Sequence, residues 1–177
     1  MRDDITLIGM PGAGKSTVGV LLAKRLGYAF LDTDLTIQEQ EGALLQELVD
    51  RLGTEAFLDL EADVLCRVDC RRTVIAPGGS AVCRERAMAR LKALGPVVYL
   101  SLSPEELERR LYNLNTRGIA LAPGQTLADL YAYRAPLYEK YADHTVEVEG
   151  GQPIEETVRR VAEVLGLWGP GQGERQG

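Results

Sequence analysis

The chain has 177 residues, of which 45% are hydrophobic and 26% are charged, and these values are typical of one compact globular domain. The formal net charge is -6; because proteins that bind nucleic acid usually carry a basic surface, we expect no nucleic-acid partner. No apolar stretch has the length of a membrane span and the first residues lack a signal-peptide pattern, so we expect no membrane partner and a cytoplasmic protein.

Short apolar runs alternate with helical patterns along the whole chain. This alternation predicts an α/β fold, with a parallel five-stranded sheet that has helices on both faces. The predicted strands are residues 5–8, 28–31, 73–76, 96–100 and 144–148. The predicted helices are residues 16–26, 35–41, 44–52, 55–67, 83–94, 104–111, 126–141 and 154–165.

The chain is predicted to form a single domain over residues 1–168, followed by a flexible, glycine-rich tail over residues 169–177. Residues 113–125 contain asparagines, glycines and a proline, a composition typical of a mobile loop on a rigid frame. No apolar surface stripe stands out, so we expect a monomer.

The first loop carries a nucleotide-binding motif. Residues 9–16 read G-M-P-G-A-G-K-S and match the P-loop pattern G-x-x-x-x-G-K-[ST] between a predicted strand and a predicted helix. In such a loop, backbone N–H groups and the helix N-terminus bind phosphates, the lysine contacts the β and γ oxygens, and the hydroxyl binds Mg²⁺. We therefore expect ATP and Mg²⁺ to bind here, held by the residues Gly12, Ala13, Gly14, Lys15, Ser16 and Thr17.

Two acids follow the second predicted strand. Because alternate residues of a strand point to one side, Asp32 and Asp34 are expected to face the same way, one for the metal and one for an acceptor hydroxyl. The Asn-Lys-x-Asp segment of GTPases and the Asp-Glu strand end of motor ATPases are both absent from the sequence. The pattern favours a kinase of small hydroxylated molecules.

These motifs and their spacing resemble the shikimate kinase family. The resemblance covers about residues 3–165 and rests on the P-loop, on F-L-D-T-D at 30–34 and on G-T-E-A-F at 53–57. It continues through Glu61, A-P-G-G-S at 76–80, E-R-R at 108–110 and R-A-P-L-Y at 134–138. It implies a nucleoside-monophosphate-kinase-like domain with a substrate-binding helical region, residues 33–62, and a lid, residues 112–126.

The resemblance also implies a role for each matching residue. Lys15, Asp34 and Arg117 would be catalytic, with Asp34 as the base or orienting group and Arg117 as the lid cation at the transferring phosphate. Ser16 and Asp32 would serve Mg²⁺, and Arg110 would lie against the adenine. The acceptor would be bound by the residues Asp34, Gly78, Gly79 and Arg134.

The sequence departs from the family pattern at three places. Leu58 stands where the family has an arginine that helps to bind the shikimate carboxylate. Ser80 replaces a glycine and adds a hydroxyl donor, and Gly118 replaces a lid proline. Another cation, such as Arg51 on the adjacent helix, could supply the missing charge. The expected reaction is phosphorylation of shikimate. The alternatives are phosphorylation of another hydroxy acceptor, such as homoserine or a sugar acid, and a nucleotide-binding protein without transferase activity.

The remaining reactive side chains are not expected to take part in chemistry. Cys66, Cys70 and Cys83 are odd in number and lack further ligands that would complete a metal site. His144, the single histidine, has no catalytic partner nearby in the sequence.

Overall fold

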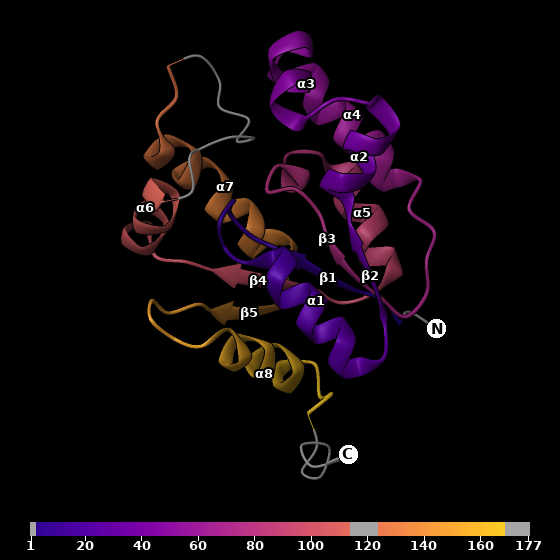
Figure 1. The fold of residues 1–177 in the computed structure, drawn as a ribbon, viewed down its shortest axis with the longest axis vertical. Coiled ribbons are helices and arrows are strands. Elements are labelled where there is room, and N and C mark those ends of the chain that lie inside the picture. Colours follow the sequence, from indigo (N-terminus) through magenta and orange to yellow (C-terminus); the bar gives the residue numbers. More distant parts are fainter. Residues whose placement is uncertain (1–2, 114–123, 169–177) are drawn as a thin grey trace.

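The structure is a computed structural model that describes residues 3–113 and 124–168. Its five strands form one sheet in the order β2-β3-β1-β4-β5, and every neighbouring pair is parallel (Figure 1). Each strand lies within one residue of the predicted bounds. The strands are β1 (Ile5–Ile8), β2 (Ala29–Asp32), β3 (Thr73–Ala76), β4 (Val97–Ser101) and β5 (His144–Glu147).

Helices cover the sheet on both faces, as predicted. The chain runs from β1 to β2 in one direction across the sheet and from β3 to β4 in the other direction. Because both connections are right-handed, their helices lie on opposite faces. Helices α1 and α8 lie side by side on one face, whereas α4 and α5 pack together on the other (Figure 1). The helices are α1 (Lys15–Leu26), α2 (Thr33–Glu41), α3 (Leu45–Leu52), α4 (Thr54–Cys66), α5 (Glu85–Leu94), α6 (Pro104–Asn113), α7 (Leu127–Tyr141) and α8 (Ile154–Val164).

Three predicted helices differ from the observed ones by two residues at one end, and one of them, α6, ends at Asn113 instead of residue 111. The helix predicted from residue 83 is α5, which starts at residue 85, and a 3-10 turn, η1 (Ala81–Cys83), precedes it. Arg84 separates the two because its backbone is extended, with φ -128° and ψ 114°. Helix α2 starts two residues earlier than predicted, because the Asp32 side chain caps it by accepting a hydrogen bond from the Asp34 amide at 3.0 Å.

The core explains why the strands read as continuous apolar runs. All residues of β1 and β3 are buried, as are the first four of β4, because helices shield both faces of a parallel sheet. A second, smaller cluster joins α2, α3 and α4 through Ile37, Leu48 and Phe57. It makes the region of residues 33–62 a packed unit above the sheet's carboxyl edge.

Across the described ranges, none of the helices has both the length and the apolar composition needed to cross a bilayer.

Candidate active site

The P-loop connects β1 to α1. Gly9 passes so close to β4 that a Cβ there would stand 2.6 Å from the Leu100 carbonyl oxygen, so only glycine fits. Gly14 then turns the chain into α1 with a left-handed backbone, φ 92°. Lys15, the first residue of α1, is buried, and its Nζ donates to the carbonyls of Gly9 and Met10 at 2.9 and 3.0 Å. The lysine thus lies folded over its own loop, at the expected phosphate site.

The Ser16 hydroxyl meets the carboxyl end of β2. It donates a hydrogen bond of 2.6 Å to Oδ2 of Asp32, while Oδ1 of Asp32 accepts from the Asp34 amide. Asp32 is the last residue of β2, but Asp34 lies in the first turn of α2. The prediction that strand alternation aligns the two acids is therefore wrong, and the helix cap places Asp34 instead.

A glycine turn after β3 carries the other side of the site. A Cβ on Gly78 would collide with Oε1 of Glu61 and stand 2.8 Å from Oδ1 of Asp34, so two carboxylates face this glycine. A Cβ on Gly79 would stand 2.9 Å from Cδ of Pro11 in the P-loop, so this glycine also packs closely. The Gly79 carbonyl accepts a 2.6 Å hydrogen bond from the buried Tyr138 hydroxyl. The turn is thereby fastened to both the P-loop and α7.

Arg134 lies one helical turn before Tyr138 on the same face of α7, and its side chain is buried. A buried guanidinium needs charged or polar partners. The carboxylate of Glu61 attracts this one, whereas the ammonium group of Lys15 repels it. Arg134 therefore presents a fixed cation to the site.

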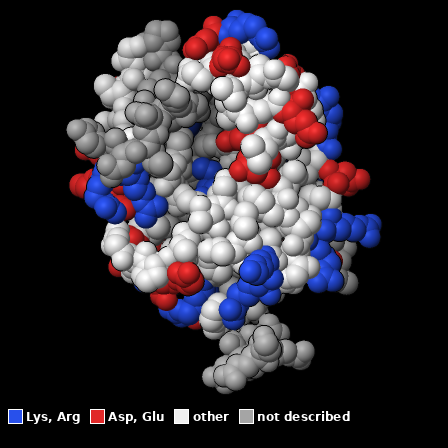
Figure 2. Space-filling model, in the orientation of Figure 1, with Lys and Arg blue, Asp and Glu red and all other residues white. Residues whose placement is uncertain are grey.

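These elements enclose a cavity of about 570 Å³. In Figure 2 it opens as a hollow where basic and acidic side chains meet. The volume suits a ligand of small-molecule size. The described residues that line it are Pro11, Gly12, Gly14, Lys15, Ser16, Thr17, Asp34, Leu45, Phe57, Glu61, Pro77, Gly78, Gly79, Ser80, Arg110, Arg134 and Ile154.

Burial shifts the acid–base properties of three of these groups. It raises the pKa of Glu61 to about 7, against the Ser80 hydrogen bond, and it raises the pKa of Asp34 to about 6, against the attraction of Lys15. Burial lowers the pKa of Lys15 to about 8, against the attraction of Asp34. Clustered groups with shifted pKa values, drawn from different elements into one cavity, are typical of active sites.

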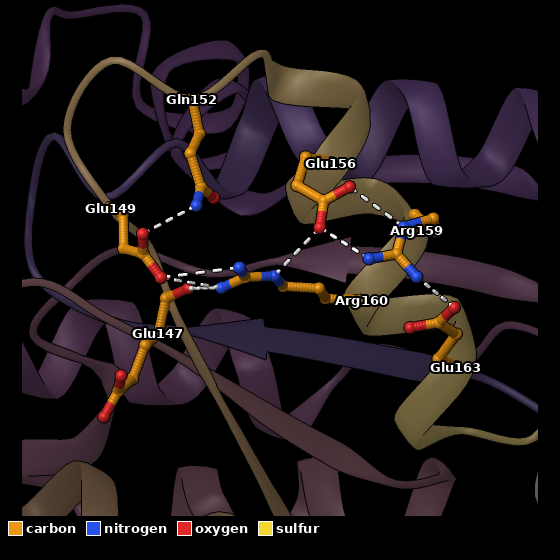
Figure 3. A network of polar contacts seen from close by, with 7 residues as sticks. All are labelled: Glu147, Glu149, Gln152, Glu156, Arg159, Arg160 and Glu163. Carbon is orange, nitrogen blue, oxygen red and sulfur yellow. Dashed lines mark hydrogen bonds and ion pairs between the residues drawn. The ribbon is translucent and has the colours of Figure 1, made fainter.

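The outer wall of the cavity comes from α6 and from the start of α8. Arg110 donates to Oε1 of Glu106 at 2.6 Å and to the Gly12 carbonyl at 3.2 Å. The loop before α8 is anchored by ion pairs: Arg160 bonds to Glu149 and Glu156, and Gln152 donates to Glu149 at 2.7 Å (Figure 3). This network fixes the entry to α8, where Ile154 lines the cavity.

The structure brings most of the predicted site residues together. Asp32 and Ala13 are the two described ones that do not line the cavity themselves: Asp32 bonds to Ser16, and Ala13 is buried, its amide bonded to the Met10 carbonyl. Arg117 and Gly118 lie outside the described residues, as do most of the predicted lid, residues 112–126, and the predicted tail.

Two further expectations concern the missing arginine. Leu58 is buried on α4 without lining the cavity, which α4 reaches instead through Phe57 and Glu61, one turn apart. Arg51 does not replace the missing charge, because its side chain is 59% exposed and lies 4.0 Å from Glu41.

Sequence reasoning missed three contributors: Glu61, Ser80 as the partner of Glu61, and Tyr138. Each carries a polar group that is buried in the fold. Only the spacing of Phe57 and Glu61 on one helix face could have indicated that Glu61 enters the site.

Comparisons with known proteins agree with this geometry. The shikimate kinase family model matches residues 11–166. A shikimate kinase of Paracidovorax citrulli is 39% identical over 170 residues, 93% of either chain, and one of Thermodesulfovibrio yellowstonii is 36% identical over 155 residues, covering 86% of this chain and 89% of that protein.

Among solved structures, a shikimate kinase from Acinetobacter baumannii in complex with shikimate superposes with a TM-score of 0.82 at 34% identity, covering 94% of both chains. A gluconokinase from Sinorhizobium meliloti, at 21% identity and a TM-score of 0.54, shares the fold alone. With a P-loop, an acid-lined acceptor side and these matches over nearly its whole length, the chain belongs to the shikimate kinase family.

Proposed function

We propose that this chain transfers the γ-phosphate of ATP to a hydroxyl group of shikimate. The observation that carries the proposal is the meeting of a P-loop, a buried carboxylate (Asp34) and a buried cation (Arg134) in one cavity. Phosphate, hydroxyl and carboxylate groups each find a matching partner there. The relatives named shikimate kinase, at 36–39% identity, support the same reaction.

The acceptor side performs the proton transfer. Asp34 binds the acceptor hydroxyl and takes its proton as the hydroxyl oxygen bonds to the γ-phosphorus. The bond between that phosphorus and the β–γ bridging oxygen breaks, and ADP leaves with the electron pair. Gly78 and Gly79 offer backbone N–H groups to the acceptor, and Arg134 binds its carboxylate as a charge-assisted pair.

On the nucleotide side, Lys15 and the P-loop amides hold the phosphates. Arg110, which donates to the Gly12 carbonyl of the loop, would lie against the adenine. Ser16 and Asp32 would hold Mg²⁺: they are hard oxygen donors joined at 2.6 Å beside the phosphate loop, as this ion prefers. When bound, Mg²⁺ neutralises charge on the phosphate oxygens. Arg117 adds positive charge to the transferring group, and the lid, residues 112–126, excludes water.

Two further parts of the proposal concern the whole protein. We infer that it acts as a monomer, because no apolar surface stripe stands out in the sequence. We also infer a cytoplasmic location, since Cys66, Cys70 and Cys83 are all free thiols, as is usual in a reducing compartment. Light scattering after size-exclusion chromatography would check the monomer, and a dimer would contradict it.

A coupled ADP-release assay tests the function. ATP and Mg²⁺ are supplied with shikimate, homoserine, gluconate or no acceptor, and phosphorus NMR identifies the product. We expect strong stimulation by shikimate alone, and a Lys15→Ala protein is expected to lose both ATP binding and turnover. Stimulation by homoserine or gluconate but not by shikimate would reject the proposed acceptor, and silence with all of them would reject kinase activity.

A further inference from the structure

The glycine turn that follows β3 has little conformational restraint of its own. Gly78 and Gly79 are consecutive and lack a Cβ, so their backbone can adopt many more conformations than that of other residues. Both glycines line the cavity, and the proposed function uses their N–H groups to bind the acceptor. Because donors bind a ligand well only when they are held in one geometry, the rest of the fold must restrain this backbone.

Two hydrogen bonds to carbonyl oxygens supply the restraint. The Gly78 carbonyl accepts from the Ala81 amide at 3.2 Å, within the turn itself. The Gly79 carbonyl accepts from the hydroxyl of Tyr138, 59 positions away on α7, at 2.6 Å. Within residues 3–113 and 124–168, no other group donates to the Gly79 carbonyl. The orientation of the peptide between Gly79 and Ser80 therefore depends on Tyr138.

The direction of this hydrogen bond determines where the next amide points. Gly79 and Ser80 line the cavity but Tyr138 does not, so the Gly79 carbonyl is directed away from the cavity. The described part of the chain contains no cis peptide bond, and in a trans peptide the N–H group points opposite to the C=O group. The Ser80 N–H is thereby turned toward the cavity side, and it has no hydrogen-bond acceptor among the described residues.

The Tyr138 ring is itself firmly held. It is fully buried and stacks on Tyr99 of β4, with the ring centroids 5.0 Å apart. Its hydroxyl also lies 3.8 Å from Sδ of Met10 in the P-loop. Burial raises the pKa of this hydroxyl, against the charge of Arg134, so the group stays protonated and remains a donor at neutral pH.

We propose that Tyr138 is a positioning residue for acceptor binding, which holds the peptide between Gly79 and Ser80 so that the N–H groups of the turn point into the cavity. The inference rests on the proposed function, in which this turn binds the acceptor. Since Tyr138 does not line the cavity, its effect reaches the acceptor only through the turn.

The experiment compares Tyr138→Phe with the unmodified chain in steady-state kinetics with shikimate and ATP. Phenylalanine keeps the ring that stacks on Tyr99 and removes only the donor to Gly79. The N–H groups of a less restrained turn spend less time in the binding direction. We therefore expect the KM for shikimate to rise about three- to tenfold, the usual effect of one lost hydrogen bond, and the KM for ATP to stay within about twofold.

Tyr131→Phe is the matched control. Tyr131 lies on the same helix and its hydroxyl donates to the backbone carbonyl of Leu102 at 3.0 Å, but it does not line the cavity. Both variants should lower the melting temperature, because each leaves a carbonyl without its donor. Only Tyr138→Phe should raise the KM for shikimate.

Amide NMR of the isotopically labelled protein gives a readout that a purely structural role would not change. Addition of shikimate to the unmodified chain should shift the amide resonances of Gly79 and Ser80 more than that of Thr73, which is bonded to Asp4 at the far end of β3. In Tyr138→Phe without shikimate, the resonances of Gly79 and Ser80 should broaden or double, and that of Thr73 should not. Where the variant does not fold, the titration of the unmodified chain decides alone.

Each contrary result has a separate meaning. An unchanged KM for shikimate in Tyr138→Phe would overturn the inference, as would an equal rise in Tyr131→Phe. Amide resonances of Gly79 and Ser80 that do not respond to shikimate in an active, unmodified chain would overturn it as well. An unmodified chain that does not phosphorylate shikimate would overturn the proposed function first, and the inference with it.

Discussion

The Ser16 hydroxyl donates a 2.6 Å hydrogen bond to Oδ2 of Asp32, which joins the start of α1 to the carboxyl end of β2. Ser16 stands at the start of α1, and Asp32 ends β2, the strand that follows this helix. Both side-chain oxygens are ligands that Mg²⁺ accepts. The other oxygen of Asp32 caps α2. One carboxylate therefore serves both the proposed metal site and the placement of Asp34.

Replacing Asp32 separates these two tasks. In Asp32→Asn the amide oxygen can still cap α2, but the charge that attracts the metal is lost. We expect the Mg²⁺ concentration for half-maximal activity to rise roughly ten- to hundredfold, with little change in melting temperature. Magnesium titration of ADP release measures the first quantity and thermal unfolding the second. An unchanged Mg²⁺ requirement would remove Asp32 from the proposed metal site.

Asp34 is proposed to take the acceptor proton, so its charge should matter more to turnover than to nucleotide binding. Asp34→Asn keeps the size of the side chain and removes the base. We expect kcat to fall roughly 10²- to 10⁴-fold, while the dissociation constant of ATP stays within a few-fold. Steady-state kinetics and a fluorescent-nucleotide titration check the two halves, and full acceptor-dependent turnover would refute the assignment.

We expect the buried carboxylate of Glu61 to lower the free energy of unfolding when it is ionised. Because burial raises its pKa from 4.5 to about 7, the folded chain binds a proton there more tightly than the unfolded chain does. The contribution of this group to the free energy of unfolding therefore falls as pH rises from about 4.5 to 7, by up to about 3 kcal/mol. Glu61→Gln removes this loss and keeps an oxygen for Ser80.

The melting temperature of Glu61→Gln should accordingly exceed that of the unmodified chain at pH 8, and the difference should shrink at pH 5. Glu55→Gln is the control, because Glu55 lies on the same helix with its side chain 82% exposed. A difference in melting temperature that does not depend on pH would show that burial does not raise the pKa of Glu61.

Leu58 can be tested by restoring the arginine of the family. A guanidinium at position 58, next to Phe57 on the cavity wall, would add a second cation for the acceptor carboxylate. We expect Leu58→Arg to lower the KM for shikimate about tenfold and to leave the KM for ATP unchanged. Leu58→Met, which keeps an apolar side chain of similar volume, is the control. A KM for shikimate that stays the same or rises would mean that Arg134 alone meets the need for charge.

The sequence by itself determined the α/β order, the five strands and the P-loop. Such features depend on local patterns: alternating runs of residues for the strands and helices, and a contiguous motif for residues 9–16. Lys15, Ser16 and the acids after β2 could be assigned because parallel strands end at one edge of the sheet.

Only the tertiary structure decided how the acceptor side is built. Glu61, Ser80 and Arg134 come from α4, the glycine turn and α7. The hydrogen bond between Ser80 and Glu61 and the electrostatic attraction between Glu61 and Arg134 join residues 19 and 73 positions apart, a relation that no local pattern encodes. The placement of Asp34 likewise depended on a helix cap rather than on strand alternation. Buried polar groups must find partners wherever the packing brings them, so the hydrogen bond between Ser80 and Glu61 follows from the fold and could not be foreseen from the serine itself.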